Sequence, residues 1–200
     1  NDILHYRTRT ERALILSYSE YHADGECFTN TLAKLPLRDD IETALDIRAD
    51  ASDWQVLFRT DPCMVMVDPP FDPWGFVQAG GRIDFKAPNS ILQTSGDHLR
   101  DGIYAEESVS QDPDQDYGKV IEIDLTTGAG EILSVGHRNP QGIVVDRDGQ
   151  IWSVEHGPRG GDELNLIQTG ANFGWPLETF GTQYNELPIA NTVSYGRHEA

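Results

Sequence analysis

Two stretches of the chain repeat one strand–turn–strand pattern, and this repetition restricts the fold more than any other feature. The first has apolar runs at 81–85 and 91–94 around a Lys-Ala-Pro-Asn-Ser turn and ends in Gly-Asp-His at 96–98. The second has them at 141–145 and 151–154 around an Asp-Arg-Asp-Gly turn and ends in Glu-His-Gly at 155–157. Such units recur every ~40–50 residues in β-propellers. The spacing here is somewhat longer, so we expect additional residues in the loops between strands.

Further strands are predicted by apolar or alternating runs at 13–18, 27–35, 54–58, 119–125 and 131–135. Residues 39–50 are the least β-like part and predict a helical turn or an insertion loop, and the acidic segment 101–116 predicts a long loop. Four prolines between residues 62 and 73 also predict a loop, because proline cannot donate to a sheet ladder. The sequence therefore indicates an all-β fold. We favour a β-propeller, and the alternative is a β-sandwich with two similar hairpins.

The charge of the chain argues against two classes of partner. The 200 residues carry a formal net charge of -18, and only three of the 15 basic residues are lysines. Nucleic acid and anionic membrane surfaces both need a basic footprint, so we expect neither as a partner. No apolar run approaches the ~20 residues that span a bilayer. The acidic residues are spread along the chain, which indicates either a solvated surface or carboxylates that bind Ca²⁺.

Two cysteines, Cys27 and Cys63, are the only thiols of the sequence. They do not make a zinc site, because the histidines show no matching ligand spacing. They either pair in an oxidising compartment or are unrelated small core residues. Residue 1 is Asn rather than an initiator Met and no signal peptide is visible, so we expect a mature, trimmed or partial product.

Polar and glycine-rich residues gather where the strands of the second unit end. Arg138 and Asn139 precede Pro140, and the Glu-His-Gly-Pro segment at 155–158 is followed by Asp-Glu at 162–163. β-Scaffolds place ligand sites in segments of this kind. We therefore expect the candidate site at this end of the strands.

Four motifs in this region resemble the glucose/sorbosone dehydrogenase family. They are Gly-His-Arg-Asn-Pro-Gln-Gly (136–142), Glu-His-Gly-Pro (155–158), Gly-Asp-Glu-Leu-Asn-Leu-Ile (161–167) and Asn-Phe-Gly-Trp-Pro (172–176). The resemblance is strong over about residues 77–180 and weak over 13–76. It implies a six-bladed propeller that oxidises a sugar C1 hydroxyl with pyrroloquinoline quinone (PQQ) and calcium. That fold needs more chain than is present, so we expect residues 1–200 to form about four blades of one propeller domain, without its first and last blades.

The resemblance assigns the cofactor contacts to Arg138 and Asn139. The planar donors of an Arg suit the carboxylates of PQQ, and the implied chemistry passes a hydride to the quinone, polarised by Ca²⁺ and Arg138. The alternative for Arg138 is a structural salt bridge.

The resemblance also assigns two calcium sites. Gly157 and Pro158 match backbone carbonyls that hold the cofactor-bound ion, and Ca²⁺ prefers oxygen ligands. Asp162 and Glu163 match a second, structural site. Their alternative is an exposed acidic pair after a Gly-Gly turn.

The sequence departs from the family at the proton acceptor. In the family a His stands four residues before the Arg of a Gly-Gly-Arg motif and abstracts the sugar hydroxyl proton, and here this position is Gln78. Gln has no titratable group near neutral pH and cannot act as a general base. Asp97 matches the carboxylate that orients the His. His98 follows it but should point to the opposite face of a strand, so we expect a surface or core histidine.

Two functions follow as hypotheses. The first is a periplasmic or extracellular PQQ- and Ca²⁺-dependent aldose dehydrogenase homologue that acts on a small-molecule sugar, with an altered mechanism or substrate. The second is a non-catalytic, calcium-stabilised propeller that binds carbohydrate or a protein partner. Gln78 favours the second, whereas Arg138 and Gly157 with their neighbours favour the first. A homodimer is an option for either, and the rings of His137 and His156 are expected to tie loops to the backbone.

Overall fold

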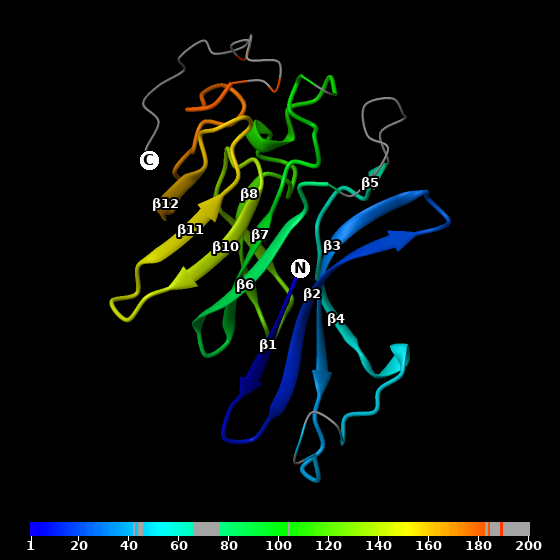
Figure 1. Ribbon diagram of the computed structural model, residues 1–200. Coiled ribbons are helices and arrows are strands. Elements are labelled where there is room, and N and C mark those ends of the chain that lie inside the picture. The colour runs from blue at the N-terminus through cyan, green and yellow to red at the C-terminus, as the bar shows by residue number, and fades with distance from the viewer. Residues whose placement is uncertain are drawn as a thin grey trace.

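Three antiparallel β-sheets lie side by side in the computed structural model (Figure 1). The structure describes residues 1–41, 43, 46–65, 77–103, 105–182, 184 and 189. The first sheet has the order β1 (Asp2–Arg7), β2 (Arg12–His22), β3 (Cys27–Pro36) and β4 (Gln55–Arg59), and β5 (Met64–Val65) also pairs with β3. The second has the order β6 (Gly80–Ala87), β7 (Ser90–Ser95), β8 (Lys119–Asp124) and β9 (Gly130–Ser134). The third contains β10 (Pro140–Val145), β11 (Ile151–Glu155) and β12 (Glu163–Ile167).

Apart from β5, each strand of a sheet pairs with the next strand in the sequence, and the turns between them are encoded locally. Between β10 and β11, Asp146 Oδ1 accepts hydrogen bonds from the backbone N–H groups of Asp148 and Gln150 (both 2.9 Å). Gly149 completes this turn with a φ of 81°, which a glycine adopts without strain. The Asp-Arg-Asp-Gly segment is therefore the turn that the sequence predicted.

The second sheet is buried on both faces. On β7, Ile91 packs in a cluster with the first sheet and its neighbour Leu92 packs in a cluster with the third, and both side chains are fully buried. Successive residues of a strand point to opposite faces, so one strand supplies both clusters. The other members of the first cluster are Tyr6, Ala13, Ile15, Leu32, Ile83, Ile121, Ile123 and Leu125, and those of the second are Val120, Leu133, Ile151, Ile167 and Phe173.

Contacts between β1, β6 and β10 join the three sheets along their first strands. β6 packs against β10 on one side and against β1 on the other. The backbone N–H of Val145 donates to Asp84 Oδ2 (2.7 Å), and Arg82 Nε forms an ion pair with Asp2 Oδ2 (3.0 Å). Neighbouring sheets whose first strands meet in this way have the arrangement of blades around a propeller axis.

The structure confirms the all-β fold and the predicted strands, which correspond to β2–β4 and β6–β11. It adds β1, β5 and β12, which the sequence patterns did not predict. The described part of 39–50 contains no strand, and a short 3₁₀ helix follows at Ala51–Asp53. The described residues form three sheets, and the expectation of about four blades stays a prediction. Residues 66–76, which include most of the proline-rich segment, and residues 190–200 lie outside the described part of the chain.

Cys27 and Cys63 form a disulfide, so the first of the two alternatives for these residues is confirmed. The bond joins the start of β3 to the segment before β5. Within the described ranges, no helix has the length and apolar character needed to cross a membrane.

Candidate functional site

Gly96, directly after β7, lies where three chain segments meet. Its N–H donates to the carbonyl of Ala79 (3.0 Å), and the N–H of Asp97 donates to the carbonyl of Arg138 (2.9 Å). A Cβ on residue 96 would lie 1.8 Å from the carbonyl oxygen of Gln78 and 3.1 Å from that of Arg138, so only glycine permits this approach. The three residues that the sequence predicted for catalysis, at positions 78, 97 and 138, are thereby brought to one point.

The side chains of Gln78, Asp97 and Arg138 form a continuous hydrogen-bonded chain. In the orientation that satisfies both neighbours, the Gln78 carboxamide donates through Nε2 to Asp97 Oδ1 (2.6 Å) and accepts through Oε1 from Arg138 Nη2 (2.9 Å). The indole N–H of Trp175 donates to the other carboxyl oxygen, Asp97 Oδ2 (2.6 Å), and the N–H of Leu99 donates to Oδ1 (3.0 Å). Both oxygens of this fully buried carboxyl group are therefore satisfied inside the protein.

Burial is the main influence on the protonation of Asp97. It raises the pKa of the carboxyl group to about 8, and the nearby Asp101 acts in the same direction. Arg138 and the hydrogen bonds from Leu99 and Trp175 oppose the rise in pKa. The Gln78 amide is one more donor that favours the ionised form.

Arg138 is a buried cation, with only 4% of its surface exposed. Its Nη1 donates to the backbone carbonyls of Gly157 (2.8 Å) and His156 (3.2 Å). The guanidinium carbon lies 5.2 Å from the ring centroid of Trp175, which is within the range of a cation–π contact. Among the described residues, no acceptor lies within hydrogen-bonding distance of its Nε. Within the described part of the chain, the hydrogen-bond partners of Arg138 are two carbonyl groups and an amide, and no carboxylate forms a salt bridge with it.

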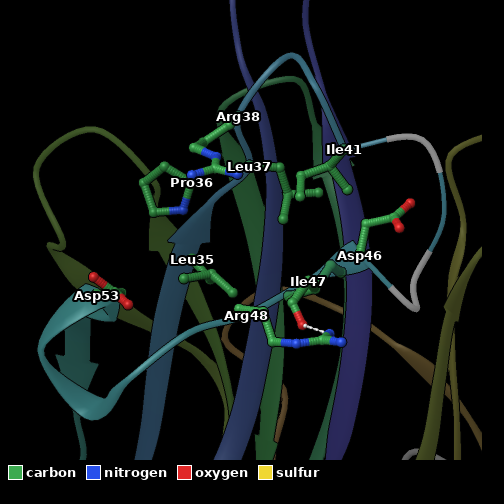
Figure 2. Close-up of a pocket in the computed structure, with 9 residues that line it drawn as sticks. All are labelled: Leu35, Pro36, Leu37, Arg38, Ile41, Asp46, Ile47, Arg48 and Asp53. Atoms are coloured by element: carbon green, nitrogen blue, oxygen red, sulfur yellow. Dashed lines mark hydrogen bonds between the residues drawn. The ribbon is translucent and has the colours of Figure 1, made fainter.

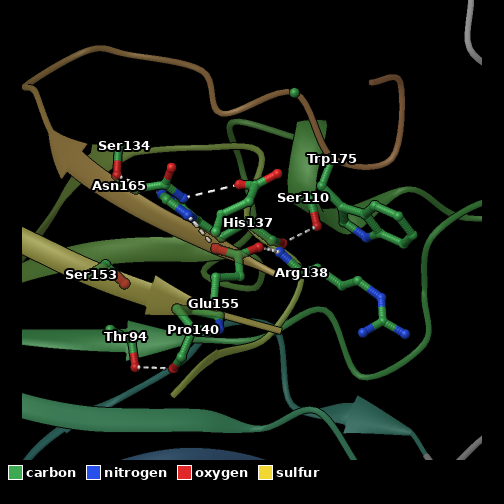
Figure 3. A network of polar contacts seen from close by, with 12 residues as sticks. Thr94, Ser110, Ser134, His137, Arg138, Pro140, Ser153, Glu155, Asn165 and Trp175 are labelled. Carbon is green, nitrogen blue, oxygen red and sulfur yellow. Dashed lines mark hydrogen bonds and ion pairs between the residues drawn. The ribbon is translucent and has the colours of Figure 1, made fainter. Parts of the chain in front are cut away.

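A second buried network holds the backbone of Arg138 (Figure 3). Glu155 Oε1 accepts from the backbone N–H of Arg138, and Oε2 of the same carboxylate lies 2.9 Å from His137 Nδ1. The other ring nitrogen of His137 lies 2.8 Å from Ser134 Oγ, and Phe173 stacks on the imidazole with the centroids 4.8 Å apart. The expectation that His137 ties its loop to the backbone was therefore wrong, because both ring nitrogens bond side chains.

Two contacts of the site were not identified from the sequence. Glu155 and Trp175 were each noted only as members of motifs, and neither was assigned a role. Their positions in the motifs could have indicated a role. Glu155 precedes the predicted calcium segment, and Trp175 belongs to the last of the four motifs. Glu155 reaches Arg138 through the β10–β11 hairpin, in which Pro140 pairs with Glu155. Trp175 is 78 positions from Asp97, so that contact depends on the packing of the third sheet against the second.

The other predicted site residues make contacts of their own. Asn139 Oδ1 accepts from Gln141 Nε2 (2.6 Å) rather than turning to Arg138. Pro158 is buried, next to the Gly157 carbonyl. Asp162 Oδ1 accepts from the backbone N–H of Gly157 (3.0 Å), which closes the 157–162 loop. Glu163 Oε2 accepts from Asn165 Nδ2 (3.0 Å).

The two remaining histidines of the region differ in burial. His98 is buried, as one of its two alternatives predicted, and its ring packs against Phe28 (4.7 Å between centroids) and Tyr117 (5.5 Å). Burial, with a smaller contribution from Arg100, lowers the pKa of His98 to about 3, so the ring does not take up a proton near neutral pH. His156 is exposed, and its Nδ1 lies 3.7 Å from Asp162 Oδ2.

The residues around Arg138 fit a planar anion better than they fit a cation. A buried guanidinium with an unpaired Nε and an aromatic face beside it is suited to carboxylates on a flat ring. A cation on the Gly157 carbonyl does not fit this arrangement, because Arg138 Nη1 already brings a positive charge to that oxygen. Within the described ranges, no three His, Cys, Asp or Glu side chains are grouped as a metal site requires.

A cavity of about 400 Å³ lies elsewhere, beside the end of β3 (Figure 2). It is lined by Leu35, Pro36, Leu37, Arg38, Ile41, Asp46, Ile47, Arg48 and Asp53. Arg38 is turned to its neighbour Asp40, with Nη2 3.0 Å from a carboxylate oxygen. The lining includes none of the residues predicted for the site, and the cavity is therefore not the site that the motifs indicate.

Adjacent antiparallel sheets with a polar site at one end of their first strands define a protein of the β-propeller class. The profile of the family described as Glucose / Sorbosone dehydrogenase matches residues 2–199, and the chain belongs to this family. The resemblance inferred from the motifs is thereby confirmed.

Three relatives illustrate the similarity. The chain is 31% identical over 192 residues to the aldose sugar dehydrogenase YliI of Escherichia coli (strain K12). This alignment covers 89% of this chain and 46% of that protein. It is 49% identical over 45 residues to the quinoprotein glucose dehydrogenase B of Acinetobacter calcoaceticus, covering 22% of this chain and 9% of that one. A crystal structure of a glucose dehydrogenase superposes with a TM-score of 0.76 and 28% identity, covering 99% of this chain and 55% of that one. The chain thus spans about half the length of the relatives that it matches over most of its length.

Proposed function

We propose that the intact protein is a PQQ-dependent aldose dehydrogenase and that this chain supplies part of its cofactor and substrate site. The observation that carries the proposal is the position of Arg138, a buried cation held against the Gly157 carbonyl and the Trp175 ring. A planar anion such as PQQ matches both the charge and the flat wall. Membership of the family and the similarity to a quinoprotein support the same ligand.

The residues of this chain would bind and orient rather than accept the proton. PQQ, when bound, supplies the acceptor of the hydride. Arg138 provides the positive charge for the carboxylates or carbonyls of the ring, and Asn139 lies next to it for a further polar contact. Gln78 stands where the sugar hydroxyl would be deprotonated, and a carboxamide takes up no proton near neutral pH. Asp97 is enclosed with both oxygens occupied, which makes it a partner of Gln78 and not a base for the sugar.

Calcium belongs to the proposal at two places. An ion at the carbonyls of Gly157 and Pro158 requires that Arg138 first leaves the Gly157 oxygen. A second ion at Asp162 and Glu163 requires that both carboxylates, which now bond within their own loop and strand, turn to a common centre.

The proposed substrate is a small-molecule sugar, and the proposed compartment is the periplasm or the extracellular space. The disulfide between Cys27 and Cys63 supports an oxidising compartment. The net charge of -18 supports the expectation that neither nucleic acid nor an anionic membrane surface is a partner. A homodimer remains an option of the proposal.

A non-catalytic propeller that binds carbohydrate or a protein is the second candidate. Gln78 favours it, because the proton acceptor of the family is replaced by a group that cannot act as a base. In that case the network around Arg138 would serve ligand binding alone.

The test uses the full-length protein with PQQ, with and without Ca²⁺, and aldoses with a dye as electron acceptor. We expect saturable PQQ binding and slow dye reduction that increases in the Gln78→His variant. Binding without turnover in either protein would favour the second candidate. The absence of PQQ binding under both calcium conditions would rule out the dehydrogenase.

A further inference from the structure

We propose that Gln78 is a positioning residue whose carboxamide holds the Arg138 guanidinium in the site. This inference deepens the proposed function and rests on it for the identity of the ligand. The arrangement of Arg138 itself is open to measurement without any ligand.

The first argument is the polarity of the bridge. The planar amide of Gln78 carries one donor group, NH₂, and one acceptor, the carbonyl oxygen. It lies between an acceptor, Asp97 Oδ1 (2.6 Å), and a donor, Arg138 Nη2 (2.9 Å). The opposite orientation would place the amide oxygen against the carboxyl oxygen and the NH₂ group against the guanidinium. Only one orientation therefore satisfies both neighbours, and it connects the Asp97 carboxyl group to the Arg138 guanidinium.

The second argument is that the bridge is held from both sides. Asp97 cannot turn away, because Trp175 and Leu99 donate to its oxygens and the group is fully buried. The backbone of Gln78 has a φ of 57°, in the left-handed region, and its carbonyl oxygen contacts Gly96. A non-glycine residue in this region persists where the surroundings determine its conformation, and such residues cluster at functional sites.

The third argument is what the bridge does to Arg138. With Nη1 on the Gly157 carbonyl, Nη2 on Gln78 and one face on Trp175, the plane of the guanidinium is fixed. Nε is left without an acceptor among the described residues. A cation that is already oriented loses less conformational freedom when it binds an anion, so Gln78 increases affinity without having to touch the ligand.

A neutral His at position 78 could form the same bridge, because one ring nitrogen donates and the other accepts. An Ala could not. The test therefore compares Gln78→Ala and Gln78→His in the full-length protein, with Gln150→Ala in the exposed β10–β11 turn as a matched control.

We expect Gln78→Ala to weaken PQQ binding at least tenfold, measured by titration, and Gln78→His and Gln150→Ala to stay within about threefold of the parent protein. In ligand-free protein, we expect Gln78→Ala to shift the NMR signals of the Arg138 Nε–H and the Trp175 indole N–H. It should also raise the pKa of Asp97, because the ionised carboxylate loses a donor. Gln78→His should restore the Arg138 and Trp175 signals.

Each result decides for or against the positioning role. Unchanged PQQ affinity in Gln78→Ala, or a Gln78→His variant as weak as Gln78→Ala, would overturn it. If the parent protein does not bind PQQ, the proposed function fails but the positioning role is still tested. Unaltered Arg138 and Trp175 signals in Gln78→Ala would then refute it, and altered signals restored by Gln78→His would support it.

Discussion

Nη1 of Arg138 lies 2.8 Å from the carbonyl oxygen of Gly157, so a residue before β10 and a residue after β11 are joined by one charged group. The two residues are 19 positions apart, and the β10–β11 hairpin brings them together by pairing Pro140 with Glu155. The same contact places the guanidinium on an oxygen that a calcium ion would need.

Replacing Gly96 with Ala should disrupt the site more than it disrupts the fold. The new Cβ would lie 1.8 Å from the Gln78 carbonyl oxygen, so the chain segments of Gln78 and Arg138 must move apart. We expect a loss of about 1–3 kcal/mol in the free energy of unfolding, as for other overpacked sites. PQQ affinity should fall at least tenfold.

The control for this variant is Gly149→Ala, at the tip of the β10–β11 turn. No atom lies within 4 Å of the added Cβ, and the cost comes only from the φ of 81°. Denaturant unfolding should show a loss of about 1 kcal/mol for this control, and titration should show unchanged PQQ affinity. Equal affinity in both variants would contradict the role assigned to Gly96.

The titration of Asp97 should make the protein less stable as pH rises from about 4 to about 8. Burial raises the pKa of this carboxyl group to about 8 in the folded protein, whereas the unfolded chain releases the proton near the ordinary value of 3.8. Between these values the unfolded state binds fewer protons, so the free energy of unfolding falls with increasing pH. Below this range the carboxyl group is protonated in both the folded and the unfolded state, and the contribution of Asp97 to stability is fully present.

Asp97→Asn removes this titrating group. The free energy of unfolding, measured with denaturant at pH 5 and pH 8.5, should therefore depend less on pH in the variant. The variant should be less stable at pH 5, because an amide cannot accept from Gln78, Leu99 and Trp175 in the same way. Asp148→Asn in an exposed turn should leave the profile unchanged. Parallel profiles for Asp97→Asn and the parent protein would show that Asp97 does not titrate in this range.

Replacing Lys119 with Met should be among the most destabilising changes in the second sheet. Its fully buried Nζ donates to the carbonyls of Val109 (2.7 Å), Ser110 (3.1 Å) and Tyr117 (2.7 Å). Met has a similar shape but leaves these oxygens without their donor, and each such loss costs about 1–3 kcal/mol. We expect a decrease of at least about 3 kcal/mol in the free energy of unfolding, measured by denaturant titration.

Lys86→Met is the matched control for this change. Lys86 pairs with Glu122 of the same sheet, both side chains are partly exposed, and the loss of Lys86 should cost less than about 1 kcal/mol. Similar losses in the two variants would mean that the carbonyls around residue 119 find other donors.

Removal of calcium tests the proposed structural ion at Asp162 and Glu163. If the ion binds the folded protein only, EDTA should lower the melting temperature, and a calcium concentration 100 times the Kd should stabilise by about 2.7 kcal/mol. Asp162→Asn keeps the acceptor for the Gly157 N–H and removes the charge, so it should abolish the effect of EDTA. An unchanged melting temperature of the parent protein in EDTA would remove this ion from the proposal.

Local patterns predicted most of the strands but not β12, for a physical reason. On β12 the apolar Leu164 is 63% exposed, whereas the polar Asn165 beside it is fully buried. At these two positions the alternation is therefore inverted relative to a strand with an apolar core face, although Ile167 of the same strand is buried, and the sequence pattern does not indicate which face is inside. The position of β12 next to β11 decides this instead.

The sequence by itself determined that the chain is all-β, that its hairpins end in polar glycine-rich segments, and that residue 78 carries no titratable base. These properties depend on residues that are neighbours in the sequence and on side-chain chemistry, so the local sequence is sufficient to infer them. Only the tertiary structure decided that Gln78 connects Asp97 to Arg138, and that Trp175 and Glu155 hold these two residues. A hydrogen bond is short and directional, so these contacts depend on the packing of the second and third sheets, which brings distant segments within hydrogen-bonding distance of one another.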